Sequence, residues 1–186
     1  MKLVAATGNA HKLKEIREIL SGFEIISQRE AGFTGDVEET GTTFLENALI
    51  KARAVCEATN LPSLADDSGL CVEELGGAPG VYSTRYSGGG DAENRALLLK
   101  NLSGKENRRA YFACAVALVY PGGRELTAEG RSYGTIIGEE RGEGGFGYDP
   151  LFLSEDLGIT FAEATEEEKN AVSHRGRALA ALLEKL

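Results

Sequence analysis

The chain has 186 residues, of which 42% are hydrophobic and 26% charged, and 20 Lys and Arg against 29 Asp and Glu give a formal net charge of −9. A chain of this length buries one hydrophobic core, so we expect a single domain over residues 1–186. The acidic balance argues against nucleic acid or an anionic membrane as a partner, although a local basic pocket still admits a small anionic substrate.

The sequence shows no signal for secretion, disulfide bonding or membrane insertion. Cys56, Cys71 and Cys114 form no CxxC pair, which predicts buried free thiols rather than a zinc site or disulfides. The first apolar run, residues 3–6, is shorter than the roughly 7–15 residues of a signal-peptide core. No run approaches the roughly 18 apolar residues of a membrane span. We therefore expect a cytoplasmic protein with no membrane partner.

Apolar periodicity predicts strands and helices that alternate along the chain. We predict strands over residues 3–6, 23–27, 109–120 and 124–136, and in residues 64–70 a strand that ends in carboxylates. We predict helices from the Thr7-Gly8-Asn9 break to about Leu20, from a cap at Thr42 to near Asn60, from a cap at Asp91 to about Asn101, and from a cap at Ser173 onward. Thr165 and Glu168 have the spacing of a capping box. This alternation is typical of an α/β domain.

The segment from Thr7 to Lys12 is the first candidate site, because it joins a strand end to a helix N-terminus. Free backbone N–H groups and the helix dipole favour an anion there, and Lys12 adds a full charge. The segment lacks the second glycine and the Ser/Thr of a Walker A loop. Taken alone, an ordinary capped helix start explains it better.

Two acidic segments are candidates for a cation site. Glu38 and Glu39 precede a glycine, and Asp66 and Asp67 follow an apolar run, where we expect a strand to end. Adjacent carboxylates repel unless a cation or a proton offsets their charge. Hard oxygen ligands of this kind suit Mg²⁺. The alternative is a solvated acidic turn. We favour this alternative for the glutamates, whereas for the aspartates a cation site and a solvated turn are equally well supported.

Two further segments are candidate ligand-binding sites. The glycines of residues 144–147 let the backbone approach a ligand, and Phe146 offers a ring on which a base stacks. His174 and Arg175 lie where the last helix begins, a position at which cations oppose the dipole unless an anion or a carbonyl binds them. For the glycine-rich segment alone, the alternative is a structural loop. For His174, it is a histidine whose hydrogen bonds are made within the protein.

Taken together, these segments resemble one family. In chain order they are Thr7-Gly8-Asn9-x-x-Lys12, Glu39-Thr40-Gly41-x-Thr43-Phe44-x-Glu46-Asn47-Ala48-x-x-Lys51-Ala52, Ala65-Asp66-Asp67-Ser68-Gly69-Leu70, Gly77-Ala78-Pro79-Gly80, Gly145-Phe146-Gly147-Tyr148-Asp149-Pro150 and Ser173-His174-Arg175-Gly176. The ordered set, from residue 2 to about residue 180, is similar to the HAM1/RdgB family of inosine triphosphate pyrophosphatases, also called XTP/dITP diphosphatases.

The resemblance implies a fold and a reaction. The fold is α/β, with a mixed elongated β-sheet flanked by helices and two lobes around a nucleotide cleft, as in the inosine triphosphatase and Maf-like proteins. The reaction cleaves the α–β phosphoanhydride of non-canonical purine triphosphates (ITP, dITP or XTP), releases the monophosphate and pyrophosphate, and so cleanses the nucleotide pool. Mg²⁺ is the implied cofactor, a free nucleotide the substrate, and a homodimer the usual assembly.

The resemblance also implies roles for residues. Glu39 and Asp67 are the implied Mg²⁺ ligands, and Asp67 is the catalytic base that takes the proton of the attacking water. Asn9, Lys12 and Lys51 are the implied triphosphate contacts, and Ser68 touches a phosphate or the sugar. The remaining implied substrate-binding residues are Thr7, Gly8, Ala10 and His11 at the first helix, and Phe146, Gly147, Tyr148, Asp149, Lys169, His174 and Arg175 around the base.

Base selection follows from hydrogen-bond chemistry. His174 and Arg175 can donate to the oxygen at position 6 of hypoxanthine or xanthine, whereas the amino group of adenine would face donors. Three other readings remain at this point: a Maf-like pyrophosphatase for other nucleotides, a nucleotide-binding module that does no chemistry, and a phosphatase that releases orthophosphate.

Overall fold

The computed structural model describes residues 1–186, and the chain forms two compact units. Unit 1 contains residues 1–67, 114–130 and 175–186, and unit 2 contains residues 68–113 and 131–174. Each unit is therefore built from segments far apart in the sequence. The chain leaves unit 1 directly after Asp67 and returns to it finally at Arg175. The single domain expected from the length stays a prediction.

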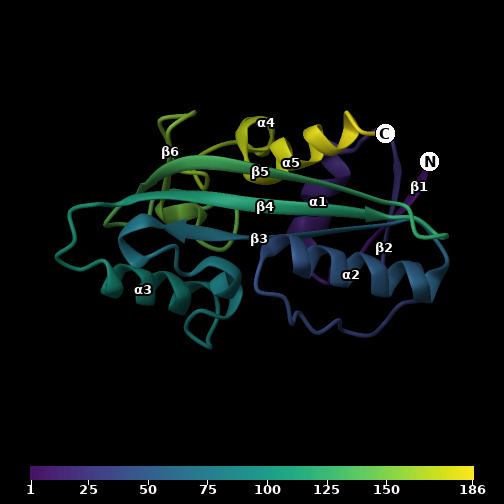
Figure 1. Ribbon diagram of the computed structural model, residues 1–186. Coiled ribbons are helices and arrows are strands. Elements are labelled where there is room, and N and C mark those ends of the chain that lie inside the picture. Colours follow the sequence, from purple (N-terminus) through teal and green to yellow (C-terminus); the bar gives the residue numbers. More distant parts are fainter. The chain divides into compact units, whose positions relative to one another are not determined.

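The strands form one six-stranded mixed sheet (Figure 1). They are β1 (Lys2–Ala5), β2 (Glu24–Ser27), β3 (Ser63–Val72), β4 (Arg109–Val119), β5 (Glu125–Ile136) and β6 (Phe152–Ser154), and the sheet order is β2-β1-β3-β4-β5-β6. β1 pairs in parallel with β2 and with β3, while β5 and β6 are antiparallel. The prediction of a mixed α/β fold is confirmed.

In unit 1, helices cover both faces of the strand layer. α1 (Ala10–Ile19) and α5 (His174–Leu183) cover one face and α2 (Phe44–Thr59) covers the other (Figure 1). Leu3 of β1 packs in the cluster with α1 and α5, whereas its neighbour Val4 packs in the cluster with α2. Successive side chains of a strand point to opposite faces, so a strand covered on both faces is apolar throughout.

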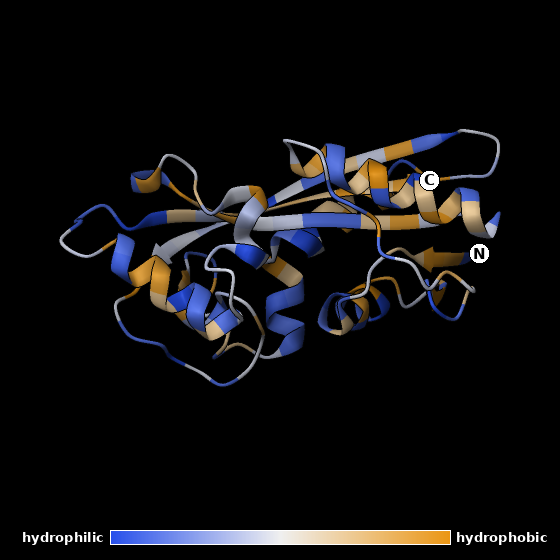
Figure 2. Cartoon of the chain, turned by 90° about the horizontal axis from the view of Figure 1, so that it is seen from below, coloured by the Kyte–Doolittle hydropathy of each residue, from blue (hydrophilic) through white to orange (hydrophobic).

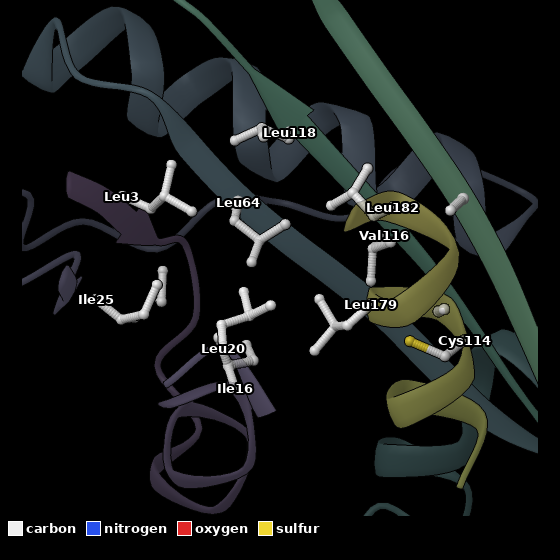
Figure 3. Packing of buried hydrophobic residues seen from close by; sticks show 13 residues of the cluster. Leu3, Ile16, Leu20, Ile25, Leu64, Cys114, Val116, Leu118, Leu179 and Leu182 are labelled. Carbon is white, nitrogen blue, oxygen red and sulfur yellow. The ribbon is translucent and has the colours of Figure 1, made fainter. Parts of the chain in front are cut away.

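The packing of α5 shows how the end of the chain joins this core. Leu179 and Leu182 are almost completely buried and lie among side chains of the strands, including Leu64 and Val116 (Figure 3). This contact fixes the helix whose first turn carries Arg175, and so it positions a predicted site residue.

Unit 2 has a separate, aromatic core. It contains α3 (Asp91–Asn101), α4 (Glu166–Val172) and three short 3₁₀ helices, η1 (Glu73–Leu75), η2 (Gly80–Arg85) and η3 (Asp149–Leu151). Phe112 and Phe161 are stacked with ring centroids 5.8 Å apart, and Phe152 lies tilted against both rings. Burying three large rings supplies much of the apolar contact that stabilises this unit.

Most predicted boundaries lie close to the observed ones, and three differ in a way that matters. The cap of α2 is Thr43, not Thr42, because Thr43 Oγ1 accepts the Glu46 N–H in a capping box. Gly90 precedes α3, and Asp91 is its first residue rather than its cap. The capping box of Thr165 with Glu168 is confirmed at α4.

The third difference concerns the paired aspartates. β3 does not end at the carboxylates but continues through Asp66 and Asp67 to Val72. The sequence suggests a strand end because charged residues are rarely buried in a strand. Buried partners, described below, override that tendency.

The helices divide into polar and apolar faces, as Figure 2 shows by the blue and orange patches along them. None of them is both long enough and apolar enough to cross a bilayer.

We predict that Leu179→Ala lowers the free energy of unfolding by about 2–5 kcal/mol, because the truncated side chain leaves a cavity in the unit 1 core. Leu183→Ala is the matched control, since Leu183 lies in the same helix but is 38% exposed. Urea unfolding monitored by circular dichroism measures both. Equal losses in the two variants would contradict the packing described for α5.

Candidate active site

Asp66 is the most deeply buried carboxylate of unit 1, and cationic side chains surround it. Its Oδ2 accepts hydrogen bonds from Arg175 Nη2 at 2.9 Å and Arg175 Nε at 3.2 Å, and it lies 3.2 Å from Lys12 Nζ. Asp66 comes from β3, Lys12 from α1 and Arg175 from α5. The charges therefore join three elements of unit 1 at one oxygen atom.

These charges decide the ionisation of Asp66. Burial by itself raises the pKa of a carboxyl, but Lys12, Arg175 and Lys51 outweigh it and hold the pKa of Asp66 well below its usual range. The carboxylate is therefore a permanent anion that balances the neighbouring cations. A carboxylate held in this way is a poor acceptor for a proton.

Asp67, the next residue, has the opposite environment. Its Oδ2 accepts a hydrogen bond from Asn47 Nδ2 at 3.1 Å, and its Oδ1 lies 3.7 Å from Lys51 Nζ. Burial raises the pKa of Asp67, and the charge of Glu39 raises it further, so that the lowering by Lys51 and Lys12 is exceeded. Of the two aspartates, Asp67 is the one whose environment favours accepting a proton.

Lys51, which lies on α2, contacts residues of both acidic segments. Its Nζ donates to the Asp66 carbonyl oxygen at 2.6 Å and lies 3.3 Å from Glu39 Oε1. Glu38 points to solvent, whereas Glu39 is half-buried beside the lysine. The residue types alone do not separate these two glutamates, although the family resemblance selects Glu39. In the structure it is Glu39 that contacts Lys51.

The start of α1 is a capped helix end. Asn9 Oδ1 accepts the backbone N–H groups of His11 and Lys12, and Thr7 Oγ1 accepts that of Asn9. His11 is exposed, as are Gly8 and Ala10. The Lys12 ammonium is directed back to Asp66 rather than into solvent. The predicted anion site thus has two of its N–H groups occupied by Asn9, and its charge is supplied by Lys12.

Residues of unit 1 fit a divalent cation whose remaining ligands come from a bound substrate. No group of three or more His, Cys, Asp or Glu side chains is arranged as a metal site. Mg²⁺ needs only one or two protein carboxylates when phosphate oxygens complete its shell. Glu39 and Asp67, which both face Lys51, supply two carboxylates, and Asp66 Oδ1 is a buried oxygen that accepts no hydrogen bond.

The family resemblance implies that Arg175 contacts the base, but in the structure its guanidinium pairs with two carboxylates. The guanidinium is 1% exposed and binds Asp66 and, through Nη1, Glu15 of α1. The structure therefore places Arg175 in the charge cluster of unit 1. Its proposed contact with the base stays a prediction.

The other predicted base residues meet in unit 2. Lys169 Nζ donates to Asp149 Oδ2 at 2.8 Å and lies 4.6 Å from the centre of the Phe146 ring. Asp149 also accepts the Phe146 backbone N–H at 3.0 Å, and a Cβ on Gly145 would collide with its carboxylate. With a φ of +68°, Gly145 has the left-handed backbone that favours glycine. The glycine-rich loop is therefore fixed around a buried ion pair.

Three more predicted residues belong to unit 2. His174 is stacked on Phe112 with ring centroids 4.7 Å apart. Tyr148 is buried, and its hydroxyl donates to the Ser83 carbonyl at 2.7 Å, which gives it a structural role in unit 2. Ser68 is half-buried in β3, directly after Asp67.

Sequence reasoning misses several residues that support these side chains. Glu15 pairs with Arg175 and lies three residues after Lys12, on the same helix face, a spacing that the sequence does show. Asn47 is completely buried and binds Asp67. Arg95 of α3 donates to the Gly147 carbonyl at 2.9 Å, and nothing in the sequence connects these two positions.

Comparison with known proteins gives one consistent family. Residues 3–185 match the model of the Ham1 family. A dITP/XTP pyrophosphatase of Geobacter sulfurreducens is 51% identical over 191 residues, which covers 100% of this chain and 96% of the relative. A dITP/XTP pyrophosphatase of Bacillus subtilis is 50% identical over 182 residues, covering 95% of this chain and 92% of the relative.

Solved structures agree with the sequence comparison. The Ham1 protein of Staphylococcus aureus superposes with a TM-score of 0.88 at 38% identity, covering 100% of this chain and 99% of that chain. A nucleoside-triphosphatase described as a dITP/XTP pyrophosphatase, from Mycobacterium abscessus, gives a TM-score of 0.78 at 49% identity, covering 98% and 99% of the two chains.

We predict that the two adjacent aspartates have opposite effects on stability in metal-free buffer at pH 7. Asp66→Asn leaves Arg175 and Lys12 without their shared anion and costs about 3–5 kcal/mol of unfolding free energy. Asp67→Asn removes a carboxylate that burial disfavours, so this variant unfolds at a higher urea concentration than the wild type. Urea unfolding in EDTA measures both.

The ionisation of Asp66 also makes the unfolding free energy depend on pH. The pKa of Asp66 is depressed in the fold, so its stabilisation is complete above the unfolded value of about 3.9 and is lost as the pH falls below it. Between pH 5 and 3 the unfolding free energy of Asp66→Asn therefore falls less steeply than that of the wild type, by up to about 1.4 kcal/mol per pH unit. Parallel slopes would show that Asp66 is not held as an anion.

Proposed function

This chain belongs to the Ham1 family, and from that membership we propose that it hydrolyses non-canonical purine nucleoside triphosphates, namely ITP, dITP and XTP, to the monophosphate and pyrophosphate. The support is twofold. Relatives named dITP/XTP pyrophosphatase share about half of its residues over nearly their whole length. The charge cluster of unit 1 also has the composition that phosphoanhydride hydrolysis requires.

The observation that carries the proposal is the cluster of lysines and carboxylates on α1, α2 and β3. Hydrolysis of a triphosphate needs positioning and charge neutralisation more than covalent catalysis. Lys12 and Lys51 are held within 4 Å of carboxylates that fix their positions. We assign them, with the segment from Thr7 to His11, to the phosphates, and Ser68 to a phosphate or the sugar. A fixed cation loses little entropy when it binds a phosphate.

Asp67 is the proposed general base. Its raised pKa and its place beside Lys51 suit a group that takes a proton from an attacking water. Two hydrogen bonds from Arg175, an ion pair with Lys12 and a depressed pKa argue against that role for Asp66. The sequence alone leaves this choice open, and the contrast in environment supports Asp67.

Mg²⁺ is the proposed metal, held by Glu39 and Asp67. When bound, it neutralises charge on the phosphate oxygens. Lys51 forms ion pairs with both carboxylates, which offsets their mutual repulsion. Their shared contact with Lys51 supports the proposal that Glu39 and Asp67 hold one cation.

The base is assigned to the residues of unit 2. Phe146 provides a ring for stacking, and Lys169, held by Asp149, provides a donor. His174, stacked on Phe112, adds a second group beside the same aromatic core. These donors suit the oxygen at position 6 of hypoxanthine and xanthine. A homodimer and a cytoplasmic location stay predictions from the family resemblance.

We predict that Asp67→Asn lowers kcat for ITP by about 10²–10⁴-fold, because the variant cannot accept the proton of water. Nucleotide affinity is retained, since the lysines remain. The assay incubates ITP with Mg²⁺ and quantifies pyrophosphate and orthophosphate separately. Asp36→Asn, which changes an exposed acid, is the control.

The products distinguish the alternatives. Pyrophosphate supports the proposal, orthophosphate indicates a plain phosphatase, and the absence of both indicates a binding module. A wild-type rate in Asp67→Asn at saturating Mg²⁺ would refute the assignment of the base.

We also predict that kcat/KM is orders of magnitude higher for ITP and XTP than for ATP, because the amino group of adenine meets donors where hypoxanthine and xanthine present an oxygen. Steady-state kinetics with ITP, XTP, GTP and ATP measure this order. A preference for ATP would contradict the assigned base contacts, and a preference for a pyrimidine nucleotide would favour a Maf-like activity.

A further inference from the structure

We propose that Asn47 of α2 is a positioning residue that holds the Asp67 carboxylate and the loop of Glu39 in one arrangement. The inference rests on the role proposed above for Asp67 and Glu39, and it adds a residue to which no chemistry has been assigned. Asn47 is completely buried, at 0% exposure, in the turn of α2 that precedes Lys51. A buried amide in a helix must find partners for both its donor and its acceptor.

Both partners of Asn47 belong to the candidate site. Its Nδ2 donates to Asp67 Oδ2 at 3.1 Å, and its Oδ1 accepts the Gly41 backbone N–H at 2.8 Å. Gly41 is two residues after Glu39, so one amide ties the loop of one proposed metal ligand to the side chain of the other. The two ligands are otherwise far apart in the chain, on a loop and on β3.

The chemistry of these partners requires an amide. A backbone N–H must meet an acceptor, and an ionised carboxylate must meet a donor, so the orientation of the Asn47 amide is fixed. An aspartate would place a second carboxylate against Asp67, and a leucine would leave the Gly41 N–H and Asp67 Oδ2 without this partner. Asparagine alone supplies both groups at this side-chain length.

Asn47 and Lys51 together fix both oxygens of Asp67. The two residues are four apart on α2, which places them on the same face of the helix. Asn47 binds Oδ2 and Lys51 lies near Oδ1, so rotation of the carboxylate would break a contact on either side. The oxygen beside Lys51 and Glu39 is thereby kept available for a cation or a water molecule.

The close approach of the loop explains the glycine at position 41. A Cβ on Gly41 would lie 2.6 Å from Asn47 Oδ1 and 2.6 Å from Glu46 Cβ. Both distances are well inside van der Waals contact, and Glu46 belongs to the capping box that begins α2. Gly41→Ala would therefore displace Asn47 without changing the charge or chemistry of any side chain in the site.

Two variants test the proposal. Asn47→Ser removes both contacts, and Gly41→Ala shifts Asn47 while keeping it. We expect each to lower kcat for ITP by about 10–100-fold, and to weaken Mn²⁺ binding by a similar factor, as loss of groups that orient metal ligands does elsewhere. Mn²⁺ binding is measured by electron paramagnetic resonance with a non-hydrolysable α,β-methylene analogue of ITP.

Asn94→Ser is the matched control. Asn94 is a buried helical asparagine whose Oδ1 accepts the Ser87 N–H and whose Nδ2 donates to the Thr84 carbonyl, with no carboxylate of the site among these partners. We expect it to lower the free energy of unfolding as Asn47→Ser does, without the loss of kcat or of Mn²⁺ affinity. A purely structural role for Asn47 would give the two serine variants the same kinetic profile.

The outcomes separate this inference from the proposed function. If Asp67→Asn loses turnover while folded Asn47→Ser and Gly41→Ala keep wild-type kcat and Mn²⁺ affinity, the positioning role of Asn47 is wrong and the proposed function stands. If the wild type releases no pyrophosphate, the proposed function fails, and Mn²⁺ affinity still decides the role of Asn47. If Asn47→Ser does not fold, unchanged values for Gly41→Ala overturn the inference.

Discussion

The site of unit 1 depends on a carboxylate that is paired while completely buried. Asp66 cannot be charged in the interior unless cations accompany it, because an unpaired buried charge costs several kcal/mol. Its partners come from the beginnings of α1 and α5, so the same ion pairs that neutralise Asp66 also hold the two helix starts against β3. Lys12 and Arg175 are therefore fixed before any substrate binds, and Glu15 completes the set on the far side of Arg175.

Asp66 and Asp67 show how environment divides one residue type into two roles. They are neighbours in a strand, so their side chains point to opposite faces. One face presents Arg175 and the other presents Asn47 and Glu39, and the pKa values of the two carboxyls move in opposite directions. Pairs of carboxylates with separated pKa values are a common arrangement in hydrolytic enzymes. The permanent anion organises the charge cluster, and its neighbour has the environment that favours accepting a proton.

The role proposed for unit 2 makes a different physical demand. A purine is flat, partly apolar and edged with acceptors, so its recognition needs rings and a few fixed donors rather than a concentration of charge. The aromatic core around Phe112 provides rigid surfaces, and the ion pair between Lys169 and Asp149 fixes a donor beside Phe146. Glycines in the loop permit the backbone bends that this packing requires.

The sequence by itself determined the α/β class, most strands and helices, and the family, because periodicity, caps and ordered motifs are local features of the chain. It also singled out Lys12 and Asp67 as candidates by residue type and Lys51 and Lys169 through the family resemblance, and the roles of all four stay predictions. Only the tertiary structure decided that β3 continues through the aspartates, that Asp66 is the structural anion, and that Arg175 pairs with it. It likewise revealed Asn47. Each of these depends on contacts between segments 20 to 109 residues apart, and the free energy that decides burial and ionisation lies in those contacts, not in local propensity.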